Sequence, residues 1–178
     1  IAKIERAEAI PFLDEILNVS DGVMVARGDL AVEVGNAAVP ALQKRIIRLA
    51  RNSKKLVITA TQMMDSMTQN IIPTRAEVSD VANAVLDGTD AVMTSGETAV
   101  GKYPAETIEA MSDICLEAEK SENLTLDTDF LNITFERIDE SIAYGALFTA
   151  YHLRVKAIIA LTESGSTPLW MSRHNIDI

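Results

Sequence analysis

Polar and charged residues follow four short hydrophobic runs that are typical of β-strands. The groups that close these runs are Lys3 and Glu5, Arg27-Gly28-Asp29, Thr61-Gln62, and Ser95-Gly96-Glu97. One such group is ordinary, because a strand must leave the core for solvent. Four in succession predict a ligand site, because the carboxyl ends of parallel strands lie at one edge of a sheet and ligands bind there.

Metal and phosphoryl chemistry fits the first two groups. Glu5 and Asp29 supply hard oxygen ligands with no histidine or cysteine beside them in the sequence, which suits Mg²⁺ or Mn²⁺. On a strand, Lys3 and Glu5 point to the same face. An ammonium group there would stabilise a transferring phosphoryl group or an enolate. The alternative is an ion pair at a strand end, and for the residues taken together we favour the metal-and-lysine interpretation.

Two further groups have both a functional and a structural interpretation. If a helical turn begins at Gly28, the amides of Gly28 and Asp29 can hold a carboxylate or a phosphate, whereas the alternative is an ordinary turn glycine. The hydroxyl of Thr61 can donate or accept a proton, and its alternative role is a hydrogen bond to nearby backbone. From these residues alone, the structural alternatives are the commoner ones.

The elements that position these residues alternate between strands and helices. Val- and Ile-rich runs predict strands, buried on both faces, over Ile1–Glu5, Gly22–Arg27, Leu56–Thr61 and Ala91–Ser95. Apolar residues at helical spacing predict helices between and after them, over 8–17, 39–49, 78–85 and 108–118. Thr74 and Glu77 form the signature of a capping box. Repeats of roughly 30 residues imply a parallel α/β fold, either an open doubly wound sheet or a (β/α)8 barrel.

The remaining third of the chain is predicted to form a linker and the start of a second domain. Residues 1–120 form the first unit, 121–135 is a polar segment without helical periodicity, and 136–178 begins another α/β domain. We expect a helix over 136–153, a buried strand over 157–161 and another helix after Pro168. The loop between them, Thr162-Glu163-Ser164-Gly165-Ser166-Thr167, offers hydroxyl and amide groups that suit a phosphate, or else it is a flexible turn.

Composition excludes several classes of protein. The net charge of the 178 residues is −10, so nonspecific binding to nucleic acid or anionic lipid is not expected. No apolar run approaches the ~20 residues of a membrane-spanning helix. A single cysteine, Cys115, excludes an internal disulfide and suits a reducing compartment. Because the chain opens directly into a strand and ends without a closing element, we expect it to be a piece of a longer protein.

Five motifs give the chain a resemblance to a known family. They are Met24–Leu30 (MVARGDL), Ala60–Met63 (ATQM), Pro73–Glu77 (PTRAE), Asp80–Gly88 (DVANAVLDG) and Ser95–Thr98 (SGET). In this order and at these spacings, with Lys3-Ile4-Glu5 at the start, they resemble pyruvate kinase over essentially the whole chain. Ala31 and Thr94 depart from the glycine and leucine that are usual in the family.

The resemblance implies a fold and a reaction. The fold is a TIM (β/α)8 barrel, of which this chain is the last four βα units, followed by the start of the C-terminal α/β domain. The reaction transfers a phosphoryl group from phosphoenolpyruvate to ADP, giving pyruvate and ATP in the cytoplasm. It requires Mg²⁺ or Mn²⁺ and usually K⁺, whose ligands the resemblance places outside this chain. The isolated 178 residues are therefore expected to be inactive.

The resemblance also implies a role for each site residue. Lys3 stabilises the transferring phosphoryl group, Glu5 and Asp29 bind the divalent metal, and Thr61 lies near the carbon that is protonated. The further residues implied are Arg27, Gly28, Asp29 and Thr61 for substrate, Ser95 for a proton relay, and Thr162, Ser164, Gly165, Ser166 and Thr167 for an effector phosphate. A homotetramer and a sugar-phosphate effector are the implied partners.

Two other functions remain as alternatives. A Mg²⁺-dependent lyase or aldolase that acts on a pyruvate enolate could use the same strand-end groups, and a requirement for ADP would separate it from a kinase. A noncatalytic module for assembly or effector binding would bind a sugar phosphate without a need for metal. The motifs at Met24–Leu30 and Pro73–Glu77 together disfavour the lyase.

Overall fold

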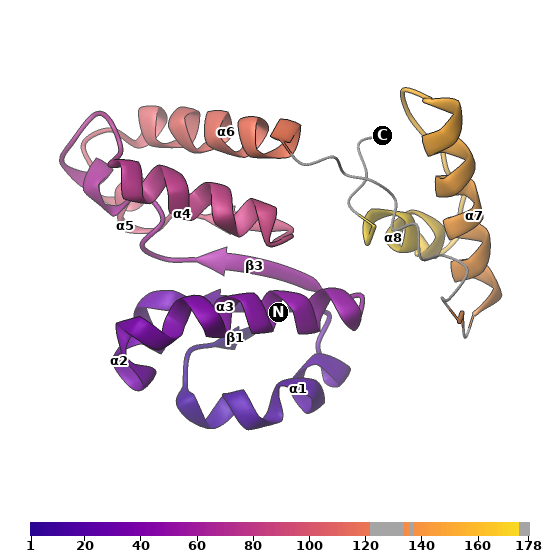
Figure 1. The fold of residues 1–178 in the computed structure, drawn as a ribbon, viewed down its shortest axis with the longest axis horizontal. Coiled ribbons are helices and arrows are strands. Elements are labelled where there is room, and N and C mark those ends of the chain that lie inside the picture. The colour runs from indigo at the N-terminus through magenta and orange to yellow at the C-terminus, as the bar shows by residue number, and fades with distance from the viewer. Residues whose placement is uncertain (122–133, 136, 175–178) are drawn as a thin grey trace. The chain divides into compact units, whose positions relative to one another are not determined.

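The computed structural model describes residues 1–121, 134–135 and 137–174. The chain divides into two compact units, Ile1–Glu122 and Asn123–Ile178, each of which is described by itself (Figure 1). Most of the linker expected at 121–135 falls on residues 122–133, which lie outside the described residues. Among the helices that the structure describes, none has the length and hydropathy needed to cross a membrane.

A four-stranded parallel sheet, in the order β1-β2-β3-β4, forms the frame of the first unit. The strands are β1 (Ala2–Ile4), β2 (Gly22–Ala26), β3 (Leu56–Ala60) and β4 (Ala91–Met93). The register pairs Ile4 with Val25, Ala26 with Ala60, and Ala60 with Met93. The last residues of neighbouring strands therefore lie side by side, and the predicted parallel α/β fold is confirmed.

Helices follow every strand of this unit. The α-helices are α1 (Leu13–Val19), α2 (Arg27–Val34), α3 (Val39–Asn52), α4 (Arg75–Leu86), α5 (Gly96–Ala99) and α6 (Pro104–Ser121). Three short 3-10 helices are η1 (Ala7–Phe12), η2 (Asn36–Ala38) and η3 (Asp65–Thr68). In Figure 1, α4 and α6 lie side by side and pack on each other.

The first helix differs from its prediction. Instead of one helix over 8–17, the chain forms η1 and then α1, with Pro11 inside η1. Proline has no N–H to donate and its ring crowds the preceding turn of an α-helix. The α-helix therefore begins only after it, at Leu13.

The core of the first unit has two clusters. One lies between the sheet and α1, α2 and α3, and it includes Val23, Val25 and Val57 of the strands with Ile46 and Ile47 of α3. The middle strands are largely buried, as predicted, but Ala91 at the start of β4 is exposed. In β1, Lys3 is exposed as well. Because β1 and β4 are the edge strands of this sheet, the prediction of burial on both faces is wrong for both of them.

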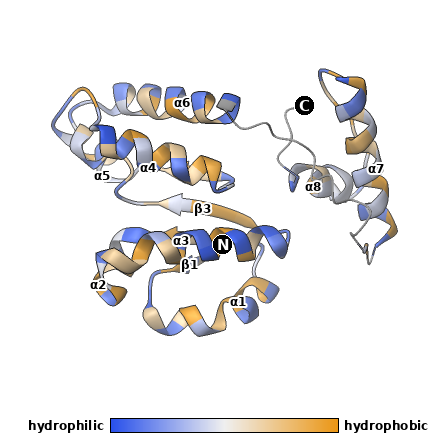
Figure 2. Ribbon diagram, viewed as in Figure 1, coloured by the Kyte–Doolittle hydropathy of each residue, from blue (hydrophilic) through white to orange (hydrophobic). Residues whose placement is uncertain are grey.

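The second cluster is built on methionine. It contains Met63, Met64, Met67, Val81, Ala84 and Met111, from the chain after β3 and from α4 and α6. The flexible thioether side chain fills irregular space between such elements. In Figure 2, hydrophilic and hydrophobic residues alternate along α4 and α6, in keeping with helices that bury one face.

The second unit contains α7 (Ile138–Leu153) and α8 (Ser166–Ser172), which pack on each other. The buried strand predicted over 157–161 is not formed, and Ile159 and Leu161 are 90% and 95% exposed. A strand needs a neighbour to pair its N–H and C=O groups. The described part of this unit holds no strand that could pair with the apolar run, which therefore forms no ladder.

Candidate active site

Lys3, Glu5 and Asp29 meet at the carboxyl ends of β1 and β2. The Nζ of Lys3 lies 2.5 Å from Oε2 of Glu5 and 3.0 Å from Oδ2 of Asp29. Asp29 is in the first turn of α2, which begins directly after β2. The pairing of β1 with β2 thus brings together two carboxylates that are far apart in the sequence, with one ammonium between them.

An open pocket of about 470 Å³ surrounds this cluster. Its lining residues are Lys3, Glu5, Arg6, Asp29, Val32 and Glu33. Sequence reasoning missed Arg6 and Glu33. Glu33 lies one helical turn after Asp29 on α2, so recognising that helix would have placed both carboxylates on the same side.

The cluster shifts the protonation of its own members. Hydrogen bonds from Lys3 to Glu5 and then to Asp29 raise the pKa of Lys3 above its ordinary value. The same bond to Lys3 lowers the pKa of Asp29 below its usual range. Both shifts favour the charged forms, so the site holds a cation and an anion in contact near neutral pH.

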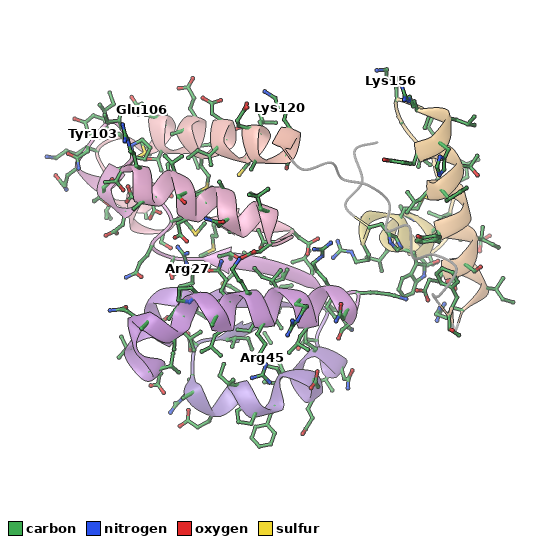
Figure 3. The ribbon with its side chains drawn as sticks, in the orientation of Figure 1. Arg27, Arg45, Tyr103, Glu106, Lys120 and Lys156 are labelled. Carbon is green, nitrogen blue, oxygen red and sulfur yellow. The ribbon has the colours of Figure 1, made fainter. Side chains whose placement is uncertain are left out.

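Arg27 is engaged inside the protein rather than at the pocket. Its side chain is 7% exposed and its Nη1 donates to Oδ2 of Asp80 at 2.5 Å, and to Oε1 of Gln43 at 3.4 Å. Nε and Nη2 both donate to the carbonyl oxygen of Thr61, and Nη2 also donates to that of Gln62. Figure 3 shows Arg27 between α3, which carries Gln43, and α4, which carries Asp80.

Thr61 is held beside Gly28 in an unusual backbone conformation. Thr61 and Gln62 have φ values of +67° and +53°, in the left-handed region. The amide of Gly28 donates to Oγ1 of Thr61 at 2.8 Å. A Cβ on residue 28 would lie 3.4 Å from Oγ1 of Thr61, an ordinary van der Waals distance, so the hydrogen bond and not a lack of space defines this contact.

The fourth strand end is joined to the third by Glu97. This carboxylate is 1% exposed and accepts from the amides of Met64 at 3.2 Å and Ser95 at 2.9 Å. Ser95 itself precedes α5, and none of the interactions found among the described residues links its side chain to Lys3, Asp29 or Thr61. Side-chain bonds therefore connect strand ends one to two, two to three, and three to four.

Sequence reasoning placed the strand ends at one edge but missed the residues behind them. Asp80 lies 53 residues from Arg27 and Gln43 lies 16 residues from it. Both sit within helices that the sequence predicts for their apolar faces. Two signals could have pointed to them: Asp80 opens the motif Asp80–Gly88, and Gln43 is a polar residue that lies buried on a helix.

The loop predicted to hold an effector phosphate is closed by its own hydroxyl groups. The amide of Gly165 donates to Oγ1 of Thr162 at 3.1 Å, and Oγ of Ser164 donates to Oγ of Ser166 at 3.1 Å. Gly165 has a φ of +80°, which favours glycine. Thr167 lies in the first turn of α8, which starts before Pro168 rather than after it.

The donor set at Lys3 fits a hard divalent cation. Glu5 and Asp29 already converge on one positive charge, the ammonium of Lys3. Mg²⁺ is commonly bound by one or two carboxylates, with water and substrate oxygens completing the octahedron. Within the described residues no group of three or more His, Cys, Asp and Glu side chains gathers, and Glu5 and Asp29 are the two carboxylates that Lys3 contacts.

A parallel sheet with helices after each strand, and with charged and hydroxyl groups at the strand ends, defines an α/β domain with a candidate site at the carboxyl ends of its strands. Comparison with known proteins identifies which one. The family model for the pyruvate kinase barrel domain matches residues 1–108, and that for the pyruvate kinase alpha/beta domain matches residues 140–178. The chain belongs to the pyruvate kinase family.

Individual relatives agree with the family models. The chain is 54% identical to pyruvate kinase II of Salmonella typhimurium and 55% identical to a pyruvate kinase of Buchnera aphidicola, each over 97% of this chain. It matches the crystal structure of a pyruvate kinase from Cryptosporidium parvum with a TM-score of 0.93 and 40% identity, over 98% of this chain and 36% of that one. The chain spans 37% of the length of the two bacterial relatives.

Proposed function

We propose that this chain supplies the phosphoryl-transfer side of an active site that converts phosphoenolpyruvate and ADP into pyruvate and ATP. The bond between phosphorus and the enol oxygen of phosphoenolpyruvate breaks, and a bond to an oxygen of the ADP β-phosphate forms. The enolate that remains then takes up one proton at carbon. The contact of Lys3 with both Glu5 and Asp29 at the strand ends is the observation that carries this proposal.

Lys3 has the charge and position for the first step. Its pKa is raised by Glu5 and Asp29, so the ammonium stays protonated and stabilises negative charge on the transferring group and on the enolate oxygen. Glu5 and Asp29 would hold Mg²⁺ or Mn²⁺, which when bound acts as a Lewis acid toward the same oxygens. All three groups face the open pocket, where a substrate can enter.

Thr61 and Gly28 have the position for the second step. Because one lone pair of the Thr61 hydroxyl accepts the amide of Gly28, its hydrogen is directed elsewhere and is available to the enolate carbon or to a water. We propose that the substrate carboxylate accepts hydrogen bonds from the backbone amides of Asp29 and Gly28. The Gly28 amide would then donate to the substrate instead of to Oγ1 of Thr61. Ser95 would belong to a water relay behind Thr61.

The assay is ATP formation from phosphoenolpyruvate and ADP by the complete protein, with and without Mg²⁺. In the variant Lys3→Met we expect kcat to fall by about 10²–10³-fold, the usual effect of removing one group that stabilises transition-state charge. The matched control is Lys120→Met, since Lys120 is an exposed lysine on α6 that pairs with Glu117 (Figure 3). Equal rates in Lys3→Met and wild type would refute the assignment.

The finer properties of the family are proposals for this protein as well. They are a K⁺ requirement, a homotetramer, a cytoplasmic location, and a sugar-phosphate effector at the 162–167 loop. The K⁺ requirement is tested by replacing K⁺ with tetramethylammonium, and the homotetramer by measuring the mass by light scattering. Cell fractionation tests the location. Titration of a sugar bisphosphate into wild type and Ser164→Ala tests the effector site. We also propose that the 178-residue chain alone does not turn over, and robust rates from that polypeptide would contradict it.

A further inference from the structure

Neither chemical step uses Arg27 or Asp80, yet Arg27 donates to the carbonyl oxygen of Thr61 and Asp80 accepts from Arg27. We propose that Arg27 and Asp80 are positioning residues that hold the backbone at Thr61 and Gln62, so that the Thr61 hydroxyl meets the amide of Gly28 in the free protein and faces the enolate once substrate is bound. This inference deepens the proposed function and rests on its assignment of Thr61 to proton delivery.

The backbone that needs holding is the turn after β3. Thr61 and Gln62 are consecutive residues with φ values of +67° and +53°. The left-handed region is unfavourable for residues with a Cβ, and most of all for a β-branched residue such as threonine. Such a conformation persists only where surrounding contacts fix it.

The guanidinium of Arg27 provides those contacts. Both carbonyl oxygens of the pair accept from it: that of Thr61 from Nε at 3.1 Å and Nη2 at 2.9 Å, and that of Gln62 from Nη2 at 2.8 Å. A planar guanidinium presents its donors in a fixed fork, so it fixes the directions of both carbonyl groups at once. Lysine has one ammonium and cannot reproduce this geometry.

Asp80 orients that fork from the opposite side. Its Oδ2 accepts from Nη1 of Arg27 at 2.5 Å, which turns the edge formed by Nε and Nη2 toward Thr61. The Arg27 side chain is 7% exposed and that of Asp80 is 42% exposed. A buried charge needs a partner, and the carboxylate on α4 supplies it while remaining in contact with solvent.

The alternative is that the Arg27–Asp80 pair merely tethers α4 to the rest of the unit. The chain contains a natural comparison, because Lys44 of α3 pairs with Asp87 at the end of α4. That pair also spans two elements, but none of the interactions found among the described residues joins it to a strand end. A tether and a positioning device therefore predict different results for the two pairs.

The first test compares Asp80→Asn with Lys44→Met in the complete protein. The measurement is exchange of the pyruvate methyl hydrogens with solvent deuterium, which reports the proton step without net phosphoryl transfer. Since a positioned proton donor contributes about 10²–10⁴-fold, we expect exchange to slow by about tenfold or more in Asp80→Asn. The Kd for Mn²⁺ should stay within about twofold in both variants, and Lys44→Met should keep the wild-type exchange rate.

The second test separates positioning from loss of structure. If Asp80 acts through Thr61, adding Asp80→Asn to Thr61→Ala slows exchange no further, whereas a purely structural role adds its own loss in both backgrounds. If Asp80→Asn does not fold, Arg27→Lys is the substitute, because it keeps the positive charge but loses the forked donors. Arg27→Lys should then show the slower exchange that is expected of Asp80→Asn. Independent, additive losses would overturn the proposal, as would normal exchange in either folded variant.

A third readout does not depend on activity. The Gly28 amide is bonded to Thr61 Oγ1, so its hydrogen exchange should become about tenfold faster or more in Asp80→Asn. A wild-type protein without kinase activity in which Asp80→Asn exposes this amide would contradict the proposed function and keep the positioning role. If the wild type is active and Asp80→Asn leaves the exchange of the Gly28 amide unchanged, the proposed function is kept and the positioning role is contradicted.

Discussion

The Nζ of Lys3 lies 3.0 Å from Oδ2 of Asp29, although 26 residues separate them along the chain. The contact follows from the parallel pairing of β1 and β2, which aligns the ends of the two strands. It places one positive charge against two carboxylates at the mouth of an open pocket. The charge arrangement that the proposed chemistry needs is thus a direct product of strand register.

Removing the Asp29 carboxylate should weaken metal binding. In Asp29→Asn, one of the two carboxylates at the site is replaced by a neutral amide. We therefore expect the Mg²⁺ concentration for half-maximal activity to rise by about 10–100-fold. The measurement is a Mg²⁺ titration of the steady-state rate. Glu117→Gln is the control, since it neutralises an exposed carboxylate on α6; an unchanged Mg²⁺ requirement in Asp29→Asn would exclude Asp29 as a ligand.

The ion pair predicts the pH range in which the site stays charged. Lys3 lowers the pKa of Asp29 in the folded protein. The stabilising contribution of the Asp29 carboxylate is therefore complete above the unfolded pKa of about 3.9, and it is lost as pH falls through the lower folded pKa. Because Glu5 and Asp29 raise the pKa of Lys3, the contribution of Lys3 is complete below about 10.4 and is lost as pH rises through the folded value.

Carboxyl NMR titration checks this directly. In Lys3→Met the pKa of Asp29 should rise relative to wild type, since the donor that stabilises its charged form is gone. The carboxyl of Asp139, which pairs with Arg137 at the start of α7, serves as an internal reference and should titrate as before. An Asp29 titration that is identical in the two proteins would show that the Lys3 contact is absent in solution.

Much of the fold could be predicted because its signals are local and periodic. Val-rich runs and helical spacing locate the strands and most helices of the first unit, and the capping box at Thr74 and Glu77 is present as predicted. The run over 157–161 has the same local signal as a buried strand. Whether such a run forms a strand depends on a neighbour to pair with, which local sequence does not reveal.

Some contacts of the candidate site could be predicted from the sequence and others could not. Lys3, Glu5 and Asp29 could be brought together from sequence, because parallel strands place their carboxyl ends at one edge. The contacts of Arg27 with Asp80 and of Glu97 with Met64 could not, because they join helices and loops whose relative placement has no periodic signature. Sequence reasoning also gave Arg27 a role in binding substrate, whereas the structure turns its guanidinium into the interior.

Glu77 should contribute measurably to stability. Its carboxylate accepts from the amide and hydroxyl of Ser66 at 2.7 and 2.5 Å and from those of Thr74 at 2.8 and 2.7 Å. Glu77→Ala leaves the half-buried amide and hydroxyl of Ser66 without an acceptor, whereas the exposed donors of Thr74 can bond to water. We therefore expect a loss of about 1–3 kcal/mol, seen as a lower midpoint of thermal unfolding. Glu109→Ala, on the exposed face of α6, should change the midpoint little.

The contribution of Glu77 should also depend on pH. Burial alone would raise the pKa of Glu77, but the hydrogen bonds from Ser66 and Thr74 outweigh it and lower the pKa. Its stabilisation is therefore complete above about 4.3 and is lost as pH falls through the lower folded value. The difference in unfolding midpoint between wild type and Glu77→Ala should shrink in that acid range, and a difference that grows there would contradict this assignment.

Glu97 should tolerate even an isosteric change poorly. In Glu97→Gln the amide nitrogen would face the N–H of Met64 or Ser95, which replaces an accepted hydrogen bond by two opposed donors. We expect a loss of about 1–3 kcal/mol, measured by the midpoint of thermal unfolding. The same substitution at exposed Glu106 of α6 is the control, and equal midpoints for the two variants would show that the Glu97 bonds are not needed.

The most direct measurement is ³¹P NMR of the complete protein with phosphoenolpyruvate, ADP and Mg²⁺. For a kinase that uses Lys3, Glu5 and Asp29, the loss of the phosphoenolpyruvate signal equals the gain of the ATP signals, and the conversion stops when Mg²⁺ is chelated. Consumption of phosphoenolpyruvate to inorganic phosphate without ATP, or conversion that continues without a divalent metal, would contradict the account.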